Sequence, residues 1–351
     1  MASAGRGGVY IPPHRLRAQQ AVSDHLSAEF QRSAWEALRK SLNGVVNKVN
    51  AGNMPVLLPE LFHENLVRGR GLFVRSVMKA QLVSPIYTPV YAALVAVVNT
   101  KLPEVGELLV KRVVIQFRKA YRRSNKAVGV ALAKFMAHLV NQGLAHELLA
   151  LQVLTLLLEA VSEDSVEMAV AFTQDCGATL STVAPAGLHA VFERFRVLLQ
   201  EGTIDKRVQF TIEGLFAVRK AKFAAFPAIP PELDLVEEED RIAHEVSLDD
   251  ETLDAEEMLD VWRQDPAWDE GEASWAEIRR EILGDPEEEE GGAGGAGGGH
   301  GGGVEVEEEE EDGGGGRGAT RGLQLFTLRR RGLLVVEGPQ GPLLPFQGPP
   351  L

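Results

Sequence analysis

Apolar residues recur at helical spacing from about residue 28 to about residue 225. In the first such segment, six apolar residues fall within an arc of about 100° on a helical wheel: Trp35, Leu38, Leu42, Val45, Val46 and Val49. Further segments with this pattern follow at residues 55–66, 71–82, 88–99, 105–123, 126–143, 145–161, 165–180, 185–200 and 205–220. Segments with the strict alternation typical of β-strands are missing here, so the pattern predicts an all-α fold of about ten helices.

Short stretches rich in Gly, Pro and capping residues separate these segments, among them AGN, RGRG, SP, KLP and RSN. Such short connections make consecutive helices antiparallel, and stacked hairpins of about 40 residues predict a HEAT-type α-solenoid of about five hairpins over residues 28–230. A compact bundle is the alternative, because segments such as YAALVAVVN are apolar on more than one side. Solenoids expose long ridged surfaces, so we expect a binding function.

Charge is distributed unevenly along the chain. Residues 1–230 contain 27 Lys and Arg against 17 Asp and Glu, whereas residues 231–351 contain 9 against 33. The net charges of +10 and −24 that follow mark a boundary near residue 230. We expect residues 231–285 to form short helices near 253–264 and 272–283 that lie on the basic body by charge attraction, with a solvated acidic segment as the alternative.

The two ends of the chain differ in composition from the body. Residues 1–27 form an N-terminal extension without the apolar core of a signal peptide. Residues 286–351 begin with low-complexity Gly and Glu runs, which predict a disordered tail because they cannot bury enough apolar surface. No run of about 18 uncharged apolar residues occurs, so we expect neither secretion nor a membrane partner.

Signals for chemistry are weak. The single cysteine, Cys176, excludes a disulfide framework and is expected to be a buried thiol in a helix. The stretch HENLVRGRG resembles a zinc motif, but Val67 stands where the second His would follow His63. His138 and His146 are expected to pack between helices or face solvent. We therefore expect no catalytic residue, metal or cofactor, and no enzymatic activity.

A basic segment, KRVVIQFRKAYRRSNK, is a candidate surface for RNA or a protein partner. Its cations lie on one helix and its exit: Lys111, Arg112, Arg118, Lys119, Arg122, Arg123 and Lys126. Such a cluster of cations can bind the phosphate groups of RNA, yet the segment lacks interleaved aromatic residues on which bases stack. Cations near a helix C-terminus also suit the helix dipole without any ligand, so a solvated face stays an alternative.

Gly44 stands inside the first predicted helix, where glycine costs about 1 kcal/mol relative to alanine. On the helical wheel it lies nearly opposite the apolar arc, flanked by Asn47 and Lys48. The pair Asn43-Gly44 is also a common turn signal, so a helix break is one hypothesis. The other is that a partner approaches the helix backbone at Gly44, while Asn47 and Lys48 supply polar contacts.

The end of this helix, VVNKVN, is similar to the Leu-Asn-Lys-Leu motif of the middle domain of eukaryotic initiation factor four G. Longer stretches closely resemble the spliceosomal members of that family, over roughly residues 9–285: YIPPHRLR, SAWEALRKSLNG, ENLVRGRGL, SPIYTPVYAALVAVVNTKLPEVGELL, FRKAYRRSNK, HLVNQGLAHELL, TLLLE, IDKRVQF and LDLVEEED. The resemblance implies a HEAT-type middle domain. The family places a second helical domain, of the MA-three kind, after an acidic linker, and residues 320–351 do not resemble it.

The resemblance also implies a function. Its spliceosomal members bind the DEAD-box helicase of the exon junction complex, hold the two helicase lobes apart in an inactive form, and recruit the helicase for splicing. The family's helicase-contacting positions correspond to Gly44, Asn47 and Lys48. The implied partners are this helicase, other spliceosomal proteins and RNA within the spliceosome, and the implied location is the nucleus, in nuclear speckles. An RNA-binding solenoid without a helicase partner is the alternative function.

Overall fold

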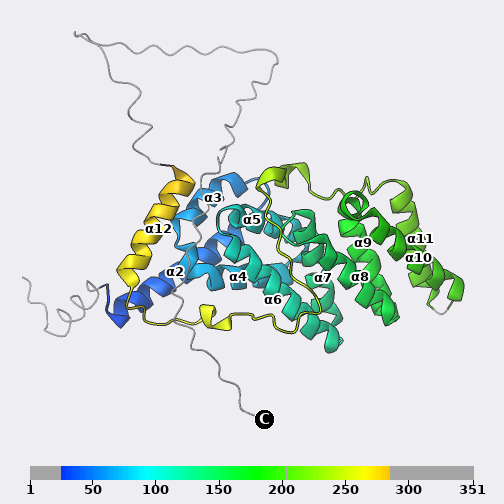
Figure 1. Ribbon diagram of the computed structural model, residues 1–351, viewed down its shortest axis with the longest axis horizontal. Coiled ribbons are helices and arrows are strands. Elements are labelled where there is room, and N and C mark those ends of the chain that lie inside the picture. Colours follow the sequence, from blue (N-terminus) through cyan, green and yellow to red (C-terminus); the bar gives the residue numbers. More distant parts are fainter. Residues whose placement is uncertain (1–24, 203, 285–351) are drawn as a thin grey trace, which may run out of the picture. The chain divides into compact units, whose positions relative to one another are not determined.

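The computed structural model describes residues 25–202 and 204–284, and within these residues the fold is all-α, as predicted. Ten α-helices of this part of the chain follow one another as a HEAT-type solenoid (Figure 1). They are α2 (Ala28–Lys48), α3 (Met54–His63), α4 (Leu66–Val83), α5 (Thr88–Lys101), α6 (Pro103–Arg122), α7 (Lys126–Asn141), α8 (Glu147–Glu159), α9 (Glu163–Val183), α10 (Pro185–Glu201) and α11 (Lys206–Lys220). The predicted tail at 286–351 and all of the N-terminal extension except residues 25–27 lie outside the described residues.

Most helices begin where the sequence places a capping signal. The Ser27 hydroxyl accepts a hydrogen bond from the Phe30 amide at the start of α2, and Asn125 accepts one from Val128 at the start of α7. Ser162 forms a reciprocal capping box with Ser165 at the start of α9. These local contacts explain why the predicted boundaries agree with the structure over most of the solenoid.

The predicted break at RGRG is wrong, because α4 begins at Leu66 and runs through both glycines. A Cβ atom on Gly69 would lie 2.9 Å from Cδ1 of Leu42 in α2, and one on Gly71 would lie 2.6 Å from the carbonyl oxygen of Leu259. The two glycines therefore allow close packing of α2 and of a later segment against α4. They do not end the helix.

Helix α5 is buried on nearly all sides, which explains why its sequence also suits a compact bundle. It contacts α4, α6 and α7 of the solenoid, and a 3-10 helix, η2 (Pro231–Leu233), covers it further. The Asn99 side chain of α5 donates a hydrogen bond to the carbonyl of Ile242 at 2.7 Å. The second apolar side of α5 is thus covered by the C-terminal part of the described chain, and the solenoid keeps its stack of helix hairpins.

Residues 231–284, which we call the acidic strap, run back along the solenoid from its C-terminal to its N-terminal helices (Figure 1). The strap contains η2, η3 (Glu238–Asp240), η4 (Glu257–Asp260) and α12 (Trp268–Leu283). Along the strap its hydrogen-bond partners on the body are Gln142, then Asn99, Gln152, Arg118 and Arg112. The prediction that this segment lies on the body is confirmed by these contacts.

Arg112 of α6 holds the middle of the strap. Its guanidinium donates hydrogen bonds to the carbonyls of Ala255 at 2.6 Å and Glu256 at 2.9 Å, and to the Asp260 carboxylate at 2.8 Å. Glu256 has a φ of 47°, a left-handed conformation that non-glycine residues rarely adopt. Arg112 is only 7% exposed, and inside the protein its charge is paired with Asp260 and its guanidinium also donates to the carbonyl of Gly71.

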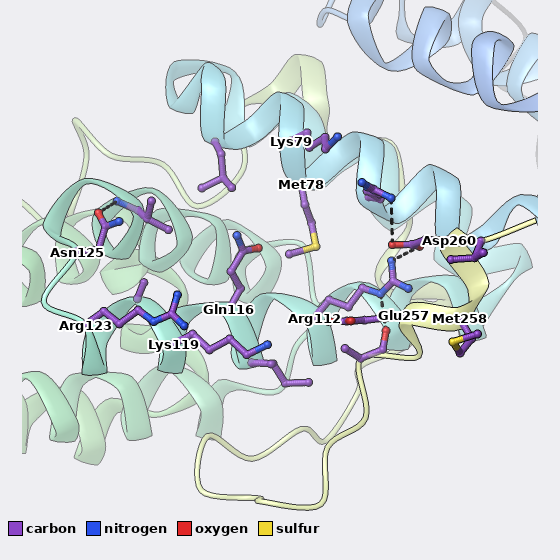
Figure 2. A pocket seen from close by; sticks show the side chains of 17 residues that line it. Met78, Lys79, Arg112, Gln116, Lys119, Arg123, Asn125, Glu257, Met258 and Asp260 are labelled. Carbon is purple, nitrogen blue, oxygen red and sulfur yellow. Dashed lines mark hydrogen bonds and ion pairs between the residues drawn. The ribbon is translucent and has the colours of Figure 1, made fainter.

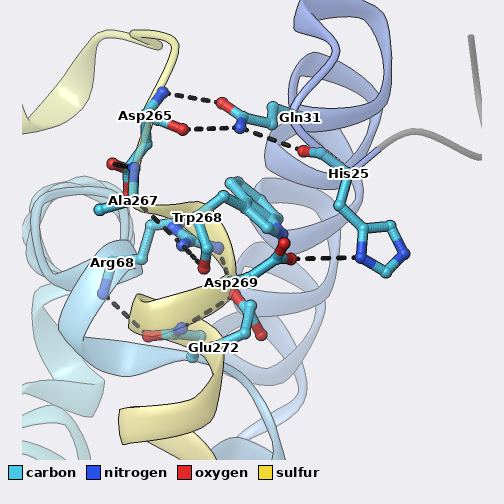
Figure 3. Close-up of polar contacts among 9 residues, drawn as sticks. His25, Gln31, Arg68, Asp265, Ala267, Trp268, Asp269 and Glu272 are labelled. Carbon is cyan, nitrogen blue, oxygen red and sulfur yellow. Dashed lines mark hydrogen bonds and ion pairs between the residues drawn. The ribbon is translucent and has the colours of Figure 1, made fainter.

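The end of the strap docks on the first helices (Figure 3). Gln31 of α2 is fully buried and exchanges two hydrogen bonds of 2.8 Å with the backbone of Asp265. Arg68 of α4 pairs with Glu272 and stacks on the Trp268 ring, with its Cζ atom 3.4 Å from the ring centroid. The helix predicted at 272–283 therefore exists as α12, although it begins earlier, at Trp268.

Two details of the strap differ from the prediction. The helix expected near 253–264 is wrong, because only the four-residue 3-10 helix η4 forms there, with its backbone turned toward Arg112. The expected reason for docking, long-range charge attraction, accounts for only part of the contacts. Body side chains bind the strap mainly through its carbonyl groups, which need donors because this irregular segment pairs with the body backbone only at His244 within the described residues.

Replacing Arg112 by methionine should destabilise the protein by about 3 kcal/mol, because the Asp260 carboxylate and three carbonyl groups would lose their buried donor. The measurement is urea denaturation of the two proteins followed by circular dichroism. Arg122→Met is the matched control on the same helix, and since Arg122 is exposed it should change stability by no more than about 0.5 kcal/mol. Equal effects of the two substitutions would contradict a clamping role for Arg112.

Candidate functional site

Helix α2 continues through Gly44 and ends at Lys48, so the hypothesis of a break at Asn43-Gly44 is wrong. Leu42, Val45 and Val46 are buried on either side of the glycine and keep the backbone in helical register. The next residue, Val49, has an extended backbone and is also buried. Burial of one side of the helix therefore outweighs the local preference of Asn-Gly for a turn.

Gly44, Asn47 and Lys48 form one outward surface of α2, which we call the Gly44 face. The side chains of Asn47 and Lys48 are exposed and make no hydrogen bond or ion pair within the described residues. A Cβ atom on Gly44 would meet no other atom within 4 Å. The helical wheel therefore predicted the orientation of all three residues correctly, and no internal packing requires a glycine at this position.

Two other helical glycines, Gly106 and Gly214, show when internal packing requires a glycine and when it does not. A Cβ on Gly106 of α6 would lie 2.0 Å from Oδ1 of Asn99, so that glycine is needed for the contact of α5 with α6. Gly214 of α11 resembles Gly44, because it too stands inside a helix with open space beside it. An open glycine alone is thus no mark of a site, and what distinguishes Gly44 is the pair of unpaired polar side chains next to it.

The backbone beside the Gly44 face is held rigidly. Asn53 donates a side-chain hydrogen bond to the Lys48 carbonyl at 2.8 Å, and Asn50 and Asn53 each accept one from the other's backbone amide. At the start of the same helix, Gln31 is fixed to the strap. Sequence reasoning missed both supports. Gln31 could have been noticed, because it is a polar residue on the apolar side of the helical wheel.

The basic surface predicted on α6 is smaller than its sequence suggests. Arg112 is buried, Arg118 donates to the carbonyl of Asp250 at 2.6 Å, and Lys111 pairs with Glu107 at 2.7 Å. Lys126 pairs with Asp164 and Glu167, and these hydrogen bonds raise the pKa of Lys126. The cations left exposed and without a partner within the described residues are Lys119, Arg122 and Arg123.

The remaining chemically active side chains serve the fold. Cys176 is fully buried in α9, as predicted, and burial raises the pKa of its thiol. His138 is buried in α7, where loss of hydration and the neighbouring Lys134 lower its pKa to about 4. His146 caps α8 by accepting a hydrogen bond from the Leu148 amide. Within the described residues, no group of three or more His, Cys, Asp and Glu side chains is arranged to hold a metal ion.

No single helix among the described residues is long and apolar enough to cross a membrane. Helices α4 and α5 pass that test only when taken together, and the pair is bent by 118° at the break between them.

Comparison with known proteins identifies relatives of this chain. Residues 39–222 match the MIF4G domain family model. The chain is 55% identical over 280 residues to the pre-mRNA-splicing factor cwc22 of Aspergillus fumigatus, and the aligned segment covers 80% of this chain and 32% of that protein. It is 51% identical over 278 residues to the CWC22 homologue of Danio rerio and equally to that of Mus musculus, covering 79% of this chain and 28% and 30% of those proteins. The chain thus spans about a third of the length of these relatives.

Replacing Gly44 by alanine should stabilise the protein by about 0.5–1 kcal/mol, because the methyl group enters open space and restricts only the unfolded chain. Gly106→Ala is the contrasting variant and should destabilise the protein, since its Cβ would overlap Asn99. Thermal melts of both variants test this difference. A lower melting temperature for Gly44→Ala would show that the residue is constrained from within the protein.

Proposed function

Because the chain belongs to the MIF4G domain family, we propose that it is a splicing scaffold whose Gly44 face captures a DEAD-box RNA helicase. The proposed partner is the helicase of the exon junction complex, which the scaffold holds open and inactive and recruits for pre-mRNA splicing and assembly of that complex. The proposal assigns no reaction to this chain itself. Such a role places the protein in the nucleus, in nuclear speckles and in contact with other spliceosomal proteins.

Two observations support the splicing role. The relatives from Aspergillus fumigatus and Danio rerio are named as pre-mRNA-splicing factors, and their similarity extends over most of this chain. The similarity is longer than the matched domain at residues 39–222, so it includes part of the sequence around it.

The observation that carries the helicase proposal is the Gly44 face itself. A partner backbone can approach α2 closely where no side chain projects, and Asn47 offers both a donor and an acceptor there. Lys48 adds a positive charge suited to a carboxylate of the partner. Both polar side chains are available to a partner, because neither makes a hydrogen bond or ion pair within the described residues.

The face is also preorganised for binding. Helix α2 packs tightly on α4 at Gly69, its N-terminal turn is fixed through Gln31, and its C-terminal end is fixed through Asn53. Because these groups are already ordered, binding loses little conformational entropy on the scaffold side. A rigid surface of this kind can prefer one arrangement of a partner with two mobile lobes.

The mechanism is a shift in the helicase's conformational equilibrium. A scaffold that binds the open form more tightly than the closed form favours the open form by the ratio of the two affinities, with about 1.4 kcal/mol for each factor of ten. Closing around RNA and hydrolysing ATP both require the closed form. The scaffold therefore inhibits the helicase by favouring its open form.

Replacing Gly44 by tyrosine should weaken helicase binding at least about tenfold, because the ring would stand between the two surfaces. The measurement is calorimetric titration of the full chain with the purified helicase, together with the RNA-stimulated ATPase rate. Gly214→Tyr is the matched control, the same change at an open glycine inside α11, and should bind normally. Unchanged binding by Gly44→Tyr would place the interface elsewhere, and binding without inhibition would overturn the shift in equilibrium.

The polar contacts are tested by the double variant Asn47→Asp with Lys48→Glu. It should also lose helicase binding, since both changes place negative charge where the partner meets a neutral amide and a cation. The control carries the same change in charge at the exposed residues Gln200 and Lys206, as Gln200→Glu with Lys206→Glu. Equal affinity of the two double variants would remove Asn47 and Lys48 from the interface.

A further inference from the structure

A groove of about 770 Å³ lies between α4, α6 and the strap (Figure 2), and no residue of the Gly44 face lines it. One wall comes from α4 through Met78, and another from α6 through Ile115 and Gln116. The strap completes the groove with residues of η4. The groove exists because Arg112 holds the strap in place by its bonds to Ala255, Glu256 and Asp260.

The groove is positively charged although the chain as a whole carries a net charge of −14. Five cations line it against two carboxylates, those of Glu257 and Asp260. Asp260 is engaged by Arg112 and lies 3.9 Å from Arg75. The other three cations are exposed and have no partner within the described residues: Lys79, Lys119 and Arg123. Lys79 lines the groove from α4, and Lys119 and Arg123 line it from α6 and the residue after it, so the groove carries unpaired positive charge along its length, which indicates an anionic ligand (Figure 2).

The same groove presents aliphatic side chains to solvent. Met258 and Val261 of the strap are each 54% exposed, although large apolar side chains of this kind are usually buried. Outside the groove, Val83 and Ile86, where α4 meets the 3-10 helix η1 (Pro85–Tyr87), are 83% and 79% exposed, and Val83 follows the groove residue Leu82 in the chain. Apolar surface next to unpaired charge is typical of a protein-binding surface.

We propose that this groove is a second docking site, which binds an acidic segment of a partner protein that also carries aliphatic side chains. The carboxylates of the segment would pair with Lys79, Lys119 and Arg123, and its aliphatic groups would cover Met258 and Val261. RNA fits less well, because the groove residues include no aromatic ring on which a base could stack, and aliphatic contacts add nothing to phosphate binding. The proposal does not depend on the Gly44 face.

The test uses the full chain and two fluorescein-labelled probes, in fluorescence anisotropy at about 50 mM and about 200 mM salt. One probe is a peptide with Asp and Glu on both sides of a central Leu-Ile-Leu run, and the other is oligouridine RNA. The variant Lys79→Glu with Lys119→Glu and Arg123→Glu should bind the peptide at least about tenfold more weakly. The control reverses three exposed cations outside the groove, Arg122, Lys206 and Lys220, and should bind it normally.

The aliphatic part of the site is tested by Met258→Ser with Val261→Ser, which leaves the charge unchanged. This variant should also weaken peptide binding, and a peptide with Ser in place of the Leu-Ile-Leu run should bind the wild-type chain more weakly. Three results would overturn the proposal. The first is no peptide binding by the wild-type chain, and the second is an equal loss of peptide affinity in the control variant. The third is that the wild-type chain binds oligouridine more tightly than the peptide, with an affinity for oligouridine that Met258→Ser with Val261→Ser leaves unchanged. Circular dichroism confirms that each variant is folded, which all these exposed positions allow.

Discussion

The buried guanidinium of Arg112 fixes the middle of the strap to helix α6 of the solenoid. Each helix of a solenoid contacts mainly the helices near it in sequence, so the stacking itself does not connect the last helices to the first. The strap supplies that connection, and Arg112 fixes it at the point where its backbone turns at Glu256. From there the strap reaches Gln31 and Arg68, which position the helix that carries the Gly44 face.

The strap is bound chiefly by side chains that donate to its carbonyl groups. Asn99, Arg112 and Arg118 each place a nitrogen within 2.7 Å of a strap carbonyl oxygen. Such contacts depend on the path of the backbone and leave many of the strap's acidic side chains exposed. The negative charge of this segment is therefore available to solvent and partners, while the basic groove beside η4 keeps its own cations unpaired.

The two proposed surfaces use different chemistry. The Gly44 face is flat and rigid and offers few polar groups, which suits the ridge of a folded partner. The groove combines exposed charge with exposed aliphatic side chains, which suits a flexible acidic segment. A scaffold that holds a folded helicase at one surface and an unfolded segment at another can bring two proteins together without any reaction of its own.

The sequence by itself determined the all-α solenoid and most helix boundaries, because helical periodicity and caps such as Ser27 and Ser162 act within a few residues. It also determined the orientation of Gly44, Asn47 and Lys48, which follows from the buried side of one helix. Only the tertiary structure decided that α4 runs through Gly69 and Gly71, that η4 replaces a predicted helix, and that Arg112, Arg118 and Lys126 have internal partners. Those outcomes depend on groups far apart in sequence, for example 148 residues for Arg112 and Asp260, and local patterns carry no information about such contacts.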